Sequence, residues 1–196
     1  MLSCQWWCRD PGALAYHDTE WGTPVHADCK HFEGLTLEVM QCGLSWELVL
    51  KKRQIFRDCF EGFDPENVAG FGEGDILRIL ETEGMIRSRR KVEATITNAA
   101  GFLGIQREFG SFDRYIWSFT GGKTLIYPSH RGKVIPENEL SARISRDLKK
   151  RGFRYLGPVT VYSYLQACGL INDHDPDCPR YRELLDIGPW AFAQEE

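Results

Sequence analysis

The chain has 196 residues, of which 42% are hydrophobic and 12% aromatic, and its net charge is −4. This length and apolar content favour one compact domain around one sizeable core. No run of about twenty uncharged apolar residues could span a bilayer, and the amino terminus lacks a signal-peptide pattern, so we expect a soluble protein with no membrane partner.

Seven cysteines occur at irregular spacings. An odd number in a chain of this length argues against a secreted disulfide framework and favours a reducing compartment, in which thiols are buried or bind metal. We therefore expect a cytoplasmic protein.

Cations are concentrated in three windows, which are residues 51–53, 87–91 and 149–154, whereas acids gather at 58–83. This separation predicts a molecule with two electrically different faces and a local positive footprint for phosphates. The alternative is that these charges lie on solvated helix faces.

Apolar residues recur at helical spacing along most of the chain, and period-two alternation is almost absent, so an all-α fold is expected. The clearest stripes run from Phe32 to Cys42, from Val92 to Leu103 and from Leu140 to Leu148. The stretch 124–136 has two prolines and no period, and we predict a loop there. We expect one domain over residues 1–180, with two intimate helical lobes as an alternative, and a C-terminal tail over 181–196.

One pair of predicted helices is joined by a short link. The helix 140–151 ends at Gly152, and Pro158 suits the first turn of a helix that reaches Gly169. Free backbone N–H groups at the start of the second helix would suit a phosphate, and cations flank the link. This pattern predicts a helix–hairpin–helix, although glycine-linked helix pairs without any ligand are also common.

Possible metal ligands lie near both ends of the chain. Cys4 and His17 are near the start, and His174 and Cys178 are near the end. Two thiolates and two imidazoles suit a closed, tetrahedral, structural zinc site that would tie the two segments together. A competing cluster at residues 26–31 also has ligand-like spacing.

Aromatic residues are crowded into the first quarter of the chain: Trp6, Trp7, Tyr16, Trp21 and Trp46. Flat rings of this kind stack on nucleobases and attract cationic rings, although an aromatic-rich core is the alternative. On the helical stripe from Phe32 to Cys42, Glu38 falls at the apolar edge, so we expect a half-buried carboxylate that either recognises a donor-rich or cationic ligand or extends to water.

Taken together, the segments AYHDTEWGTP, LEVMQCGLSWELVLKKR and KKRGFRYLGPVTVYSYLQACGLINDH, with Cys178, resemble the 3-methyladenine DNA glycosylase I family. The resemblance runs from Cys4 to Cys178 and implies an all-α helix–hairpin–helix DNA glycosylase fold.

By position, the resemblance implies a role for each of several residues. It implies Zn²⁺ held by Cys4, His17, His174 and Cys178, and it leaves the cluster at 26–31 without a family counterpart. Glu38 would be the catalytic, base-recognising carboxylate, and Tyr16, Trp46, Trp6 and Trp21 would bind the base. The hairpin would bind DNA through Gly152, Gly157, Lys149, Lys150 and Arg151. Ala13 and Glu47 depart from the family pattern, which bears on affinity and base range.

The resemblance implies a monofunctional glycosylase that flips out N3-methyladenine, hydrolyses its glycosidic bond in alkylated double-stranded DNA and releases free 3-methyladenine. No lysine follows Lys150, so a Schiff-base route to strand cleavage is not expected from the second hairpin helix. Asp173 and Asp175 follow the hairpin but flank His174, and we expect them to support the metal site or cap a loop. We expect a monomer. The alternative function is a zinc-stabilised DNA-binding or damage-sensing module without turnover.

Overall fold

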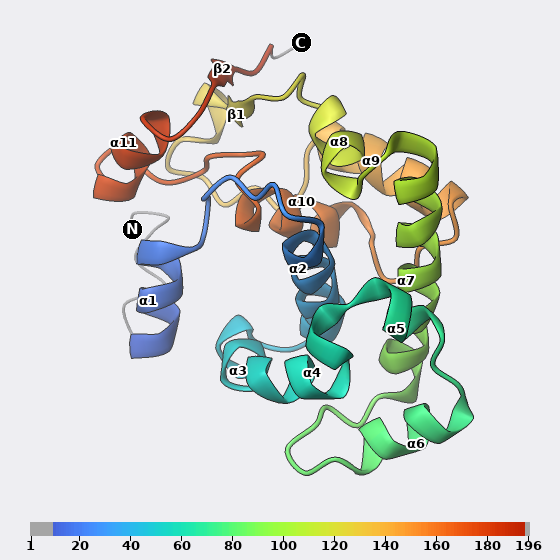
Figure 1. The fold of residues 1–196 in the computed structure, drawn as a ribbon. Coiled ribbons are helices and arrows are strands. Elements are labelled where there is room, and N and C mark those ends of the chain that lie inside the picture. Colours follow the sequence, from blue (N-terminus) through green and yellow to red (C-terminus); the bar gives the residue numbers. More distant parts are fainter. Residues whose placement is uncertain (1–9, 195–196) are drawn as a thin grey trace.

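The computed structural model describes residues 10–194. Helices dominate this part of the chain, and a two-stranded parallel sheet accompanies them (Figure 1). The elements are α1 Pro11–Thr19, α2 Asp28–Gln41, α3 Trp46–Lys51, α4 Arg53–Cys59, η2 Glu61–Phe63, α5 Pro65–Ala69, α6 Glu73–Glu81, α7 Arg89–Phe109, α8 Phe112–Ser118, β1 Thr124–Ile126, η3 Pro128–His130, α9 Glu139–Lys150, α10 Pro158–Ala167, α11 Pro179–Leu185 and β2 Trp190–Phe192.

Short polar side chains fix where several helices begin. Asp10 accepts from the backbone N–H groups of Gly12 and Ala13 at the start of α1, and Ser45 accepts from that of Leu48 at the start of α3. Asn138 and Ser141 cap α9 reciprocally. These caps satisfy donors that the first helical turn leaves without a partner, so the sequence positions α1 and α3 locally.

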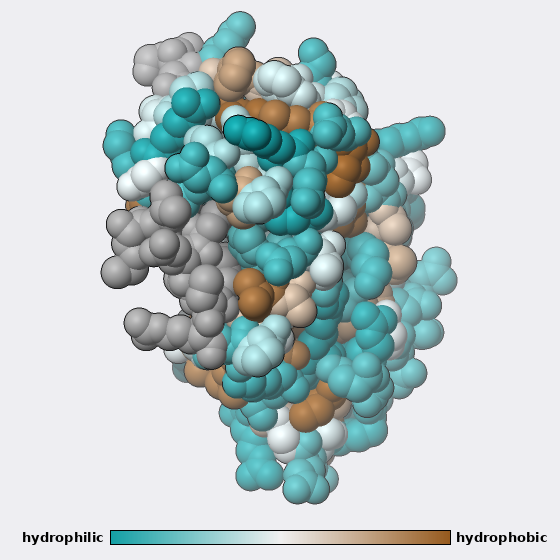
Figure 2. All heavy atoms as spheres, turned by 90° about the vertical axis from the view of Figure 1, so that its left-hand side faces the viewer, coloured by the Kyte–Doolittle hydropathy of each residue, from teal (hydrophilic) through white to brown (hydrophobic). Residues whose placement is uncertain are grey.

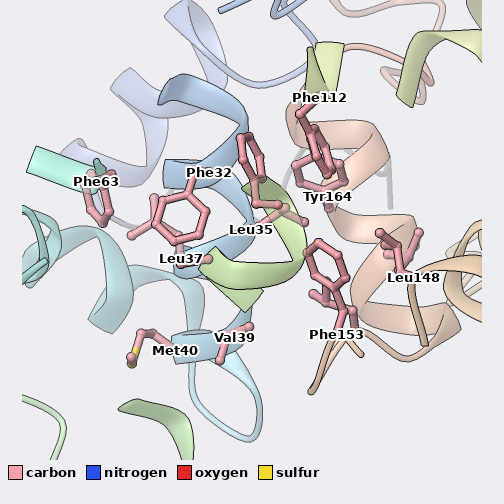
Figure 3. Close-up of a cluster of buried hydrophobic side chains, with 14 of the residues drawn as sticks. Phe32, Leu35, Leu37, Val39, Met40, Phe63, Phe112, Leu148, Phe153 and Tyr164 are labelled. Carbon is pink, nitrogen blue, oxygen red and sulfur yellow. The ribbon is translucent and has the colours of Figure 1, made fainter. Parts of the chain in front are cut away.

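Helix α2 lies at the centre of the molecule, with the long helix α7 beside it and α3 to α6 at its lower end (Figure 1). Its apolar side chains pack against side chains that arrive from several elements. In Figure 3, Phe63 lies on one side of α2, and Phe112, Tyr164, Phe153 and Leu148 lie on the other. α2 is therefore enclosed on more than one face, which decides how deeply its polar residues are buried.

The three apolar stripes and the hairpin-linked helix pair are confirmed as α2, α7, α9 and α10. The link between α9 and α10 is tight: Gly152 has φ of 90° and Tyr155 has φ of 62°. The Ser145 hydroxyl donates to the Leu156 carbonyl at 2.7 Å and closes the link against α9.

Two segments differ from the predictions. The stretch predicted as a loop contains β1 and η3, because β1 pairs with β2 across a long sequence separation, Thr124 with Trp190 and Ile126 with Phe192. Three paired residues are too few to leave an alternating pattern in the sequence.

The residues beyond 180, predicted as a tail, continue α11 and contribute β2. Leu184 is buried there, so apolar packing holds α11 against the molecule. Regular structure therefore extends past the predicted boundary. Among residues 10–194, the structure contains no helix with the length and apolarity to cross a membrane.

Candidate active site and metal centre

Glu38 is the most unusual polar residue of α2. Its side chain is 3% exposed, and its carboxyl makes neither a hydrogen bond nor an ion pair with any described residue. Burial raises the pKa of Glu38 to about 8 from its ordinary value of 4.5. We expected a half-buried group, but α2 is enclosed on several faces and Glu38 is fully buried. A buried carboxyl without a partner is costly unless a ligand supplies one.

Tyr16 lies close to this carboxyl, and Trp46 packs against Tyr16. Their ring centroids are 5.5 Å apart and the planes are tilted by 57°. Burial, and secondly the neighbouring Glu38 charge, raise the pKa of Tyr16 well above 10, so its hydroxyl stays protonated. The indole N–H of Trp46 is buried and has no acceptor among the described residues. The structure thus places Tyr16 of α1 near Glu38 of α2 and against Trp46 of α3.

Trp21 lies on the side of this group that faces the predicted metal ligands. Its ring is stacked on His17, with centroids 5.9 Å apart, and meets the edge of His174 at 4.4 Å. It also packs with Ala13 and Tyr16 in one small apolar cluster. Trp21 therefore joins the base-pocket aromatics to the histidines. Trp6 lies outside the described residues.

His17, His174 and Cys178 form a compact group of possible metal ligands. The Cys178 sulfur lies 3.8 Å from Nε2 of His17 and 3.6 Å from Nδ1 of His174. These separations are close to the ~3.6 Å expected between sulfur and nitrogen ligands of tetrahedral zinc. Cys4, the fourth predicted ligand, lies outside the described residues.

The outer nitrogens of both histidines have fixed partners. Nδ1 of His17 donates to the Asp18 carboxylate at 2.7 Å, and Nε2 of His174 donates to the Trp21 carbonyl at 3.1 Å. Each bond leaves the other ring nitrogen as the one that faces Cys178, an arrangement typical of metal-binding histidines. Burial lowers the pKa of His174 to about 4, which favours the neutral form that a metal requires. The residues present therefore fit zinc.

The competing cluster at residues 26–31 is occupied by other contacts. His31 is fully buried between the Tyr164 hydroxyl, at 2.7 Å, and Asp113. The Asp28 carboxylate accepts from the backbone N–H groups of Phe112 and Asp113. These side chains connect α2 to α8, and they are not part of a metal-ligand group in residues 10–194.

Asp173, after the hairpin, belongs to a polar network on the wall of a cavity of about 410 Å³. Its carboxylate accepts from the Tyr162 hydroxyl and from the Gln166 amide, the latter at 2.9 Å. His130 lies 3.3 Å away. Asp173 is thus held by α10 and η3.

The predicted DNA-binding residues have different environments. Gly157 precedes α10, whose first N–H groups have no intrahelical acceptor, and Lys149 and Lys150 are exposed without an ion pair in the described chain. Arg151 instead pairs with Glu108 at 2.6 Å and Asp147 at 2.7 Å. Its guanidinium also covers Phe109 and Tyr115. Lys149 and Lys150 are therefore exposed cations, whereas Arg151 holds α9 against α7 through its ion pairs.

Sequence reasoning missed two residues of α7 that hold these segments. Lys91 contacts the end of α2, and Asn98 contacts the hairpin. Both interact with backbone atoms, which leave no side-chain pattern in the sequence. The available signal was a polar residue, Asn98, beside the apolar stripe that contains Ala99.

The face that carries α1 and α11 is mostly hydrophilic, and its apolar side chains form separate patches (Figure 2). Among residues 10–194, no extended apolar interface is visible on this side.

Comparisons with known proteins identify the family. The sequence model of a family described as methyladenine glycosylase matches residues 6–181. The chain is 42% identical to DNA-3-methyladenine glycosylase 1 of Escherichia coli K12 over 92% of this chain and 97% of that protein. It is 39% identical to DNA-3-methyladenine glycosylase of Haemophilus influenzae over 90% and 96%.

Solved structures match equally well. A variant of 3-methyladenine DNA glycosylase I in complex with 3-methyladenine has a TM-score of 0.85 and 38% identity, over 91% of this chain and 97% of that one. The enzyme from Staphylococcus aureus, whose structure addresses 3-methyladenine recognition, has a TM-score of 0.83 and 39% identity, over 87% and 92%.

Proposed function

The chain belongs to the methyladenine glycosylase family, and from that membership we propose that it is a monofunctional DNA glycosylase that excises 3-methyladenine from alkylated DNA in base excision repair. The single observation that supports this most is Glu38, a buried carboxyl near Tyr16 that no described residue satisfies, with the Trp46 ring packed on Tyr16. A base that is both cationic and rich in N–H donors would satisfy it.

The proposed selection rests on charge and stacking. Methylation at N3 makes the adenine of the nucleotide cationic, and a cationic ring gains from an aromatic face and from a desolvated carboxylate. Because the pKa of Glu38 is about 8 in the unliganded protein, the carboxyl is mostly protonated at pH 7. A bound cation would favour the ionised form, so recognition would include loss of the Glu38 proton.

The chemistry needs little acid catalysis, because the alkylated base is already an activated leaving group. The nucleotide is first extruded from the duplex into the pocket. The C1′–N9 bond then breaks, and its electron pair neutralises the base. Water adds to C1′ and loses a proton, which leaves an abasic site and free 3-methyladenine. In this proposal the Glu38 carboxylate pairs with the positive charge of the base before cleavage. It accepts hydrogen bonds from the N–H groups of the base both before and after cleavage.

The proposed DNA grip is the hairpin between α9 and α10. Gly152 allows the tight link through its positive φ, and Gly157 directly precedes α10, whose first N–H groups have no intrahelical acceptor. Lys149 and Lys150 are exposed at the end of α9. These features suit backbone phosphates and carry no base specificity.

We further propose one structural zinc held by Cys4, His17, His174 and Cys178. Support comes from the compact group of three ligands and the fixed tautomers of both histidines. Bound zinc would add binding energy to folding, since the ligands lie on segments far apart in sequence. The free thiols of the described cysteines suit the reducing cytoplasm that we propose as the compartment, with the protein acting as a monomer.

The test is the release of free base from methylated double-stranded DNA, measured by chromatography with parallel quantification of abasic sites. We expect equal amounts of 3-methyladenine and abasic sites from the wild type, with no strand cleavage. The matched variant Glu38→Gln should release base much more slowly and still bind an abasic-analogue duplex. A wild type that binds alkylated DNA but releases no base would be a damage sensor, and the proposed function would be wrong.

A further inference from the structure

Lys91, near the start of α7, has an environment that is unusual for lysine. Its side chain is 7% exposed, and its ammonium donates to the carbonyls of Met40 and Cys42, both at 2.7 Å. Burial lowers its pKa, and it forms no ion pair with a carboxylate of the described residues. Lysine is almost never buried unless its charge is compensated. Here the compensation comes from the last carbonyls of α2, where the helix dipole is negative.

The segment that Lys91 holds carries the base pocket. The Cys42 N–H donates to the Glu38 carbonyl at 3.3 Å, so the carbonyls bound by Lys91 belong to the turn that directly follows Glu38. The chain then passes through Leu44, whose carbonyl accepts from the Gln41 amide, to Trp46 at the start of α3. Lys91 therefore fixes the connection between the Glu38 helix and the Trp46 helix.

Asn98 lies about two turns further along α7, on the same face. It is 2% exposed, and its amide makes two bonds to one hairpin residue. Nδ2 donates to the Arg154 carbonyl at 3.0 Å, and Oδ1 accepts from the Arg154 N–H at 2.7 Å. One turn beyond, a side chain at Gly101 would meet the Phe153 ring at 2.7 Å. The hairpin therefore packs tightly against this face of α7.

The two held segments also touch each other. The Cys42 sulfur lies 3.8 Å from the Tyr155 carbonyl and 3.7 Å from the Thr160 hydroxyl. The end of the Glu38 helix and the start of α10 are therefore neighbours, each with a separate attachment to α7.

We infer that Lys91 and Asn98 are positioning residues that set the base pocket and the DNA-binding hairpin at one fixed separation on α7. This inference rests on the proposed glycosylase function. A nucleotide whose phosphates are held by the hairpin reaches Glu38 only if that separation matches its extruded length. Lys91 positions the pocket side of this arrangement, and Asn98 positions the hairpin side.

The test separates the two sides with two binding probes, free 3-methyladenine in calorimetric titration and a duplex that contains an abasic analogue. Lys91→Met should weaken free-base binding roughly tenfold, the order expected for lost charge-assisted bonds, with duplex affinity within about twofold of wild type. Asn98→Ala should instead weaken duplex binding and leave free-base affinity close to that of the wild type. Lys91→Arg, which keeps the charge and donors, should recover most of the base affinity.

Thr95→Val is the matched control. Thr95 is a buried polar residue on α7 between the two positions, and within the described part of the chain its hydroxyl bonds only to the Lys91 carbonyl of its own helix, at 3.0 Å. It should leave both affinities unchanged even if it lowers the melting temperature. The single-turnover rate of base excision should be lower in Lys91→Met even at saturating DNA. In Asn98→Ala the same rate should return to the wild-type value when the DNA concentration is raised.

The inference would be overturned if Lys91→Met and Asn98→Ala each lost both affinities to the same extent. It would also be overturned if, in all three variants including Thr95→Val, the loss of affinity were simply proportional to the loss of stability. Wild-type base affinity in a folded Lys91→Met would do the same. The Asn98→Ala measurement decides the hairpin side even if Lys91→Met does not fold. If the wild type neither binds free 3-methyladenine nor releases it from methylated DNA, the proposed function itself is refuted. That outcome is distinct from failure of the positioning inference.

Discussion

The Cys178 sulfur lies 3.8 Å from Nε2 of His17, although the two residues are 161 positions apart in sequence. This contact joins α1, which carries Tyr16, to the segment that precedes α11. The base pocket and the proposed metal centre therefore share one helix, and loss of the metal would reach the pocket through α1.

We predict one zinc per chain in protein purified without added metal, as measured by elemental analysis. The double variant Cys4→Ser, Cys178→Ser should lose it and unfold at a lower temperature, because metal binding contributes folding free energy. Cys29→Ser, which removes an exposed thiol, is the control and should keep the metal. Stoichiometric zinc in the double variant would disprove the ligand assignment.

Glu38 should make the unliganded protein less stable as the pH rises. Its folded pKa of about 8 lies above the ordinary 4.5, so the folded state retains a proton that the unfolded state loses. The free energy of unfolding should fall between pH 4.5 and 8, with a slope of at most about 1.4 kcal/mol per pH unit from this group.

The variant Glu38→Gln removes that titration. Its stability relative to wild type should increase through this pH window and level off above it. Urea unfolding at a series of pH values measures the difference. A constant difference between the two proteins would mean that Glu38 is ionised in the folded state.

Base recognition should depend on the Glu38 charge and on the Trp46 ring in different ways. Glu38→Gln keeps the size and one acceptor, so it should weaken binding of a cationic alkylated base by roughly 10- to 150-fold and of neutral adenine much less. Trp46→Ala should weaken both through lost stacking. Because the released base is neutral, the test is calorimetric titration of a doubly alkylated adenine that keeps its positive charge, with adenine as the neutral comparison. Equal affinity of wild type and Glu38→Gln for the cation would make Glu38 a purely structural residue.

The hairpin cations should contribute electrostatic, sequence-independent DNA affinity. Lys149→Gln with Lys150→Gln should weaken binding equally across sequences and reduce the magnitude of the salt slope by roughly 2. Lys123→Gln, an exposed cation outside the hairpin, is the control. An unchanged slope in the hairpin variant would move the DNA footprint elsewhere.

Arg151→Gln should behave differently from its lysine neighbours. Its guanidinium is bound to Glu108 and Asp147 and lies over two aromatic rings. We therefore expect a lower melting temperature as its main effect, with a smaller change in salt slope than either lysine gives. The reverse result would place Arg151 on the DNA.

Apolar periodicity was sufficient to predict α2, α7 and α9, because each buries a continuous stripe, whereas α10 was predicted from Pro158 at its start and Gly169 after its end. It failed for β1, whose three residues are held by a strand far along the chain. Periodicity also placed Glu38 at a half-buried edge, since a stripe describes one face and carries no information on what covers the others. The ligand types of His17, His174 and Cys178 were visible in the sequence, but their approach depends on the whole fold.

Lys91 illustrates what remains hidden from the sequence. It stands in a cationic window with Arg89, which pairs with Glu73 and Glu93 at the surface. Nothing in the letters distinguishes the two cations. What distinguishes Lys91 is the position of the α2 carbonyls in the folded chain. These backbone acceptors are the same for every residue type, so the sequence does not show where they lie.

The contact between His17 and Cys178 also constrains when the molecule can be completed during synthesis. Residues 18–178 are 161 residues, and at about 5–20 residues per second their translation takes roughly 8–32 s. Throughout that time the nascent α1 lacks its contact with the C-terminal segment, so the histidine group cannot assemble before Cys178 leaves the ribosome. The segment around Cys178 is therefore needed to complete the environment of a helix that is synthesised much earlier.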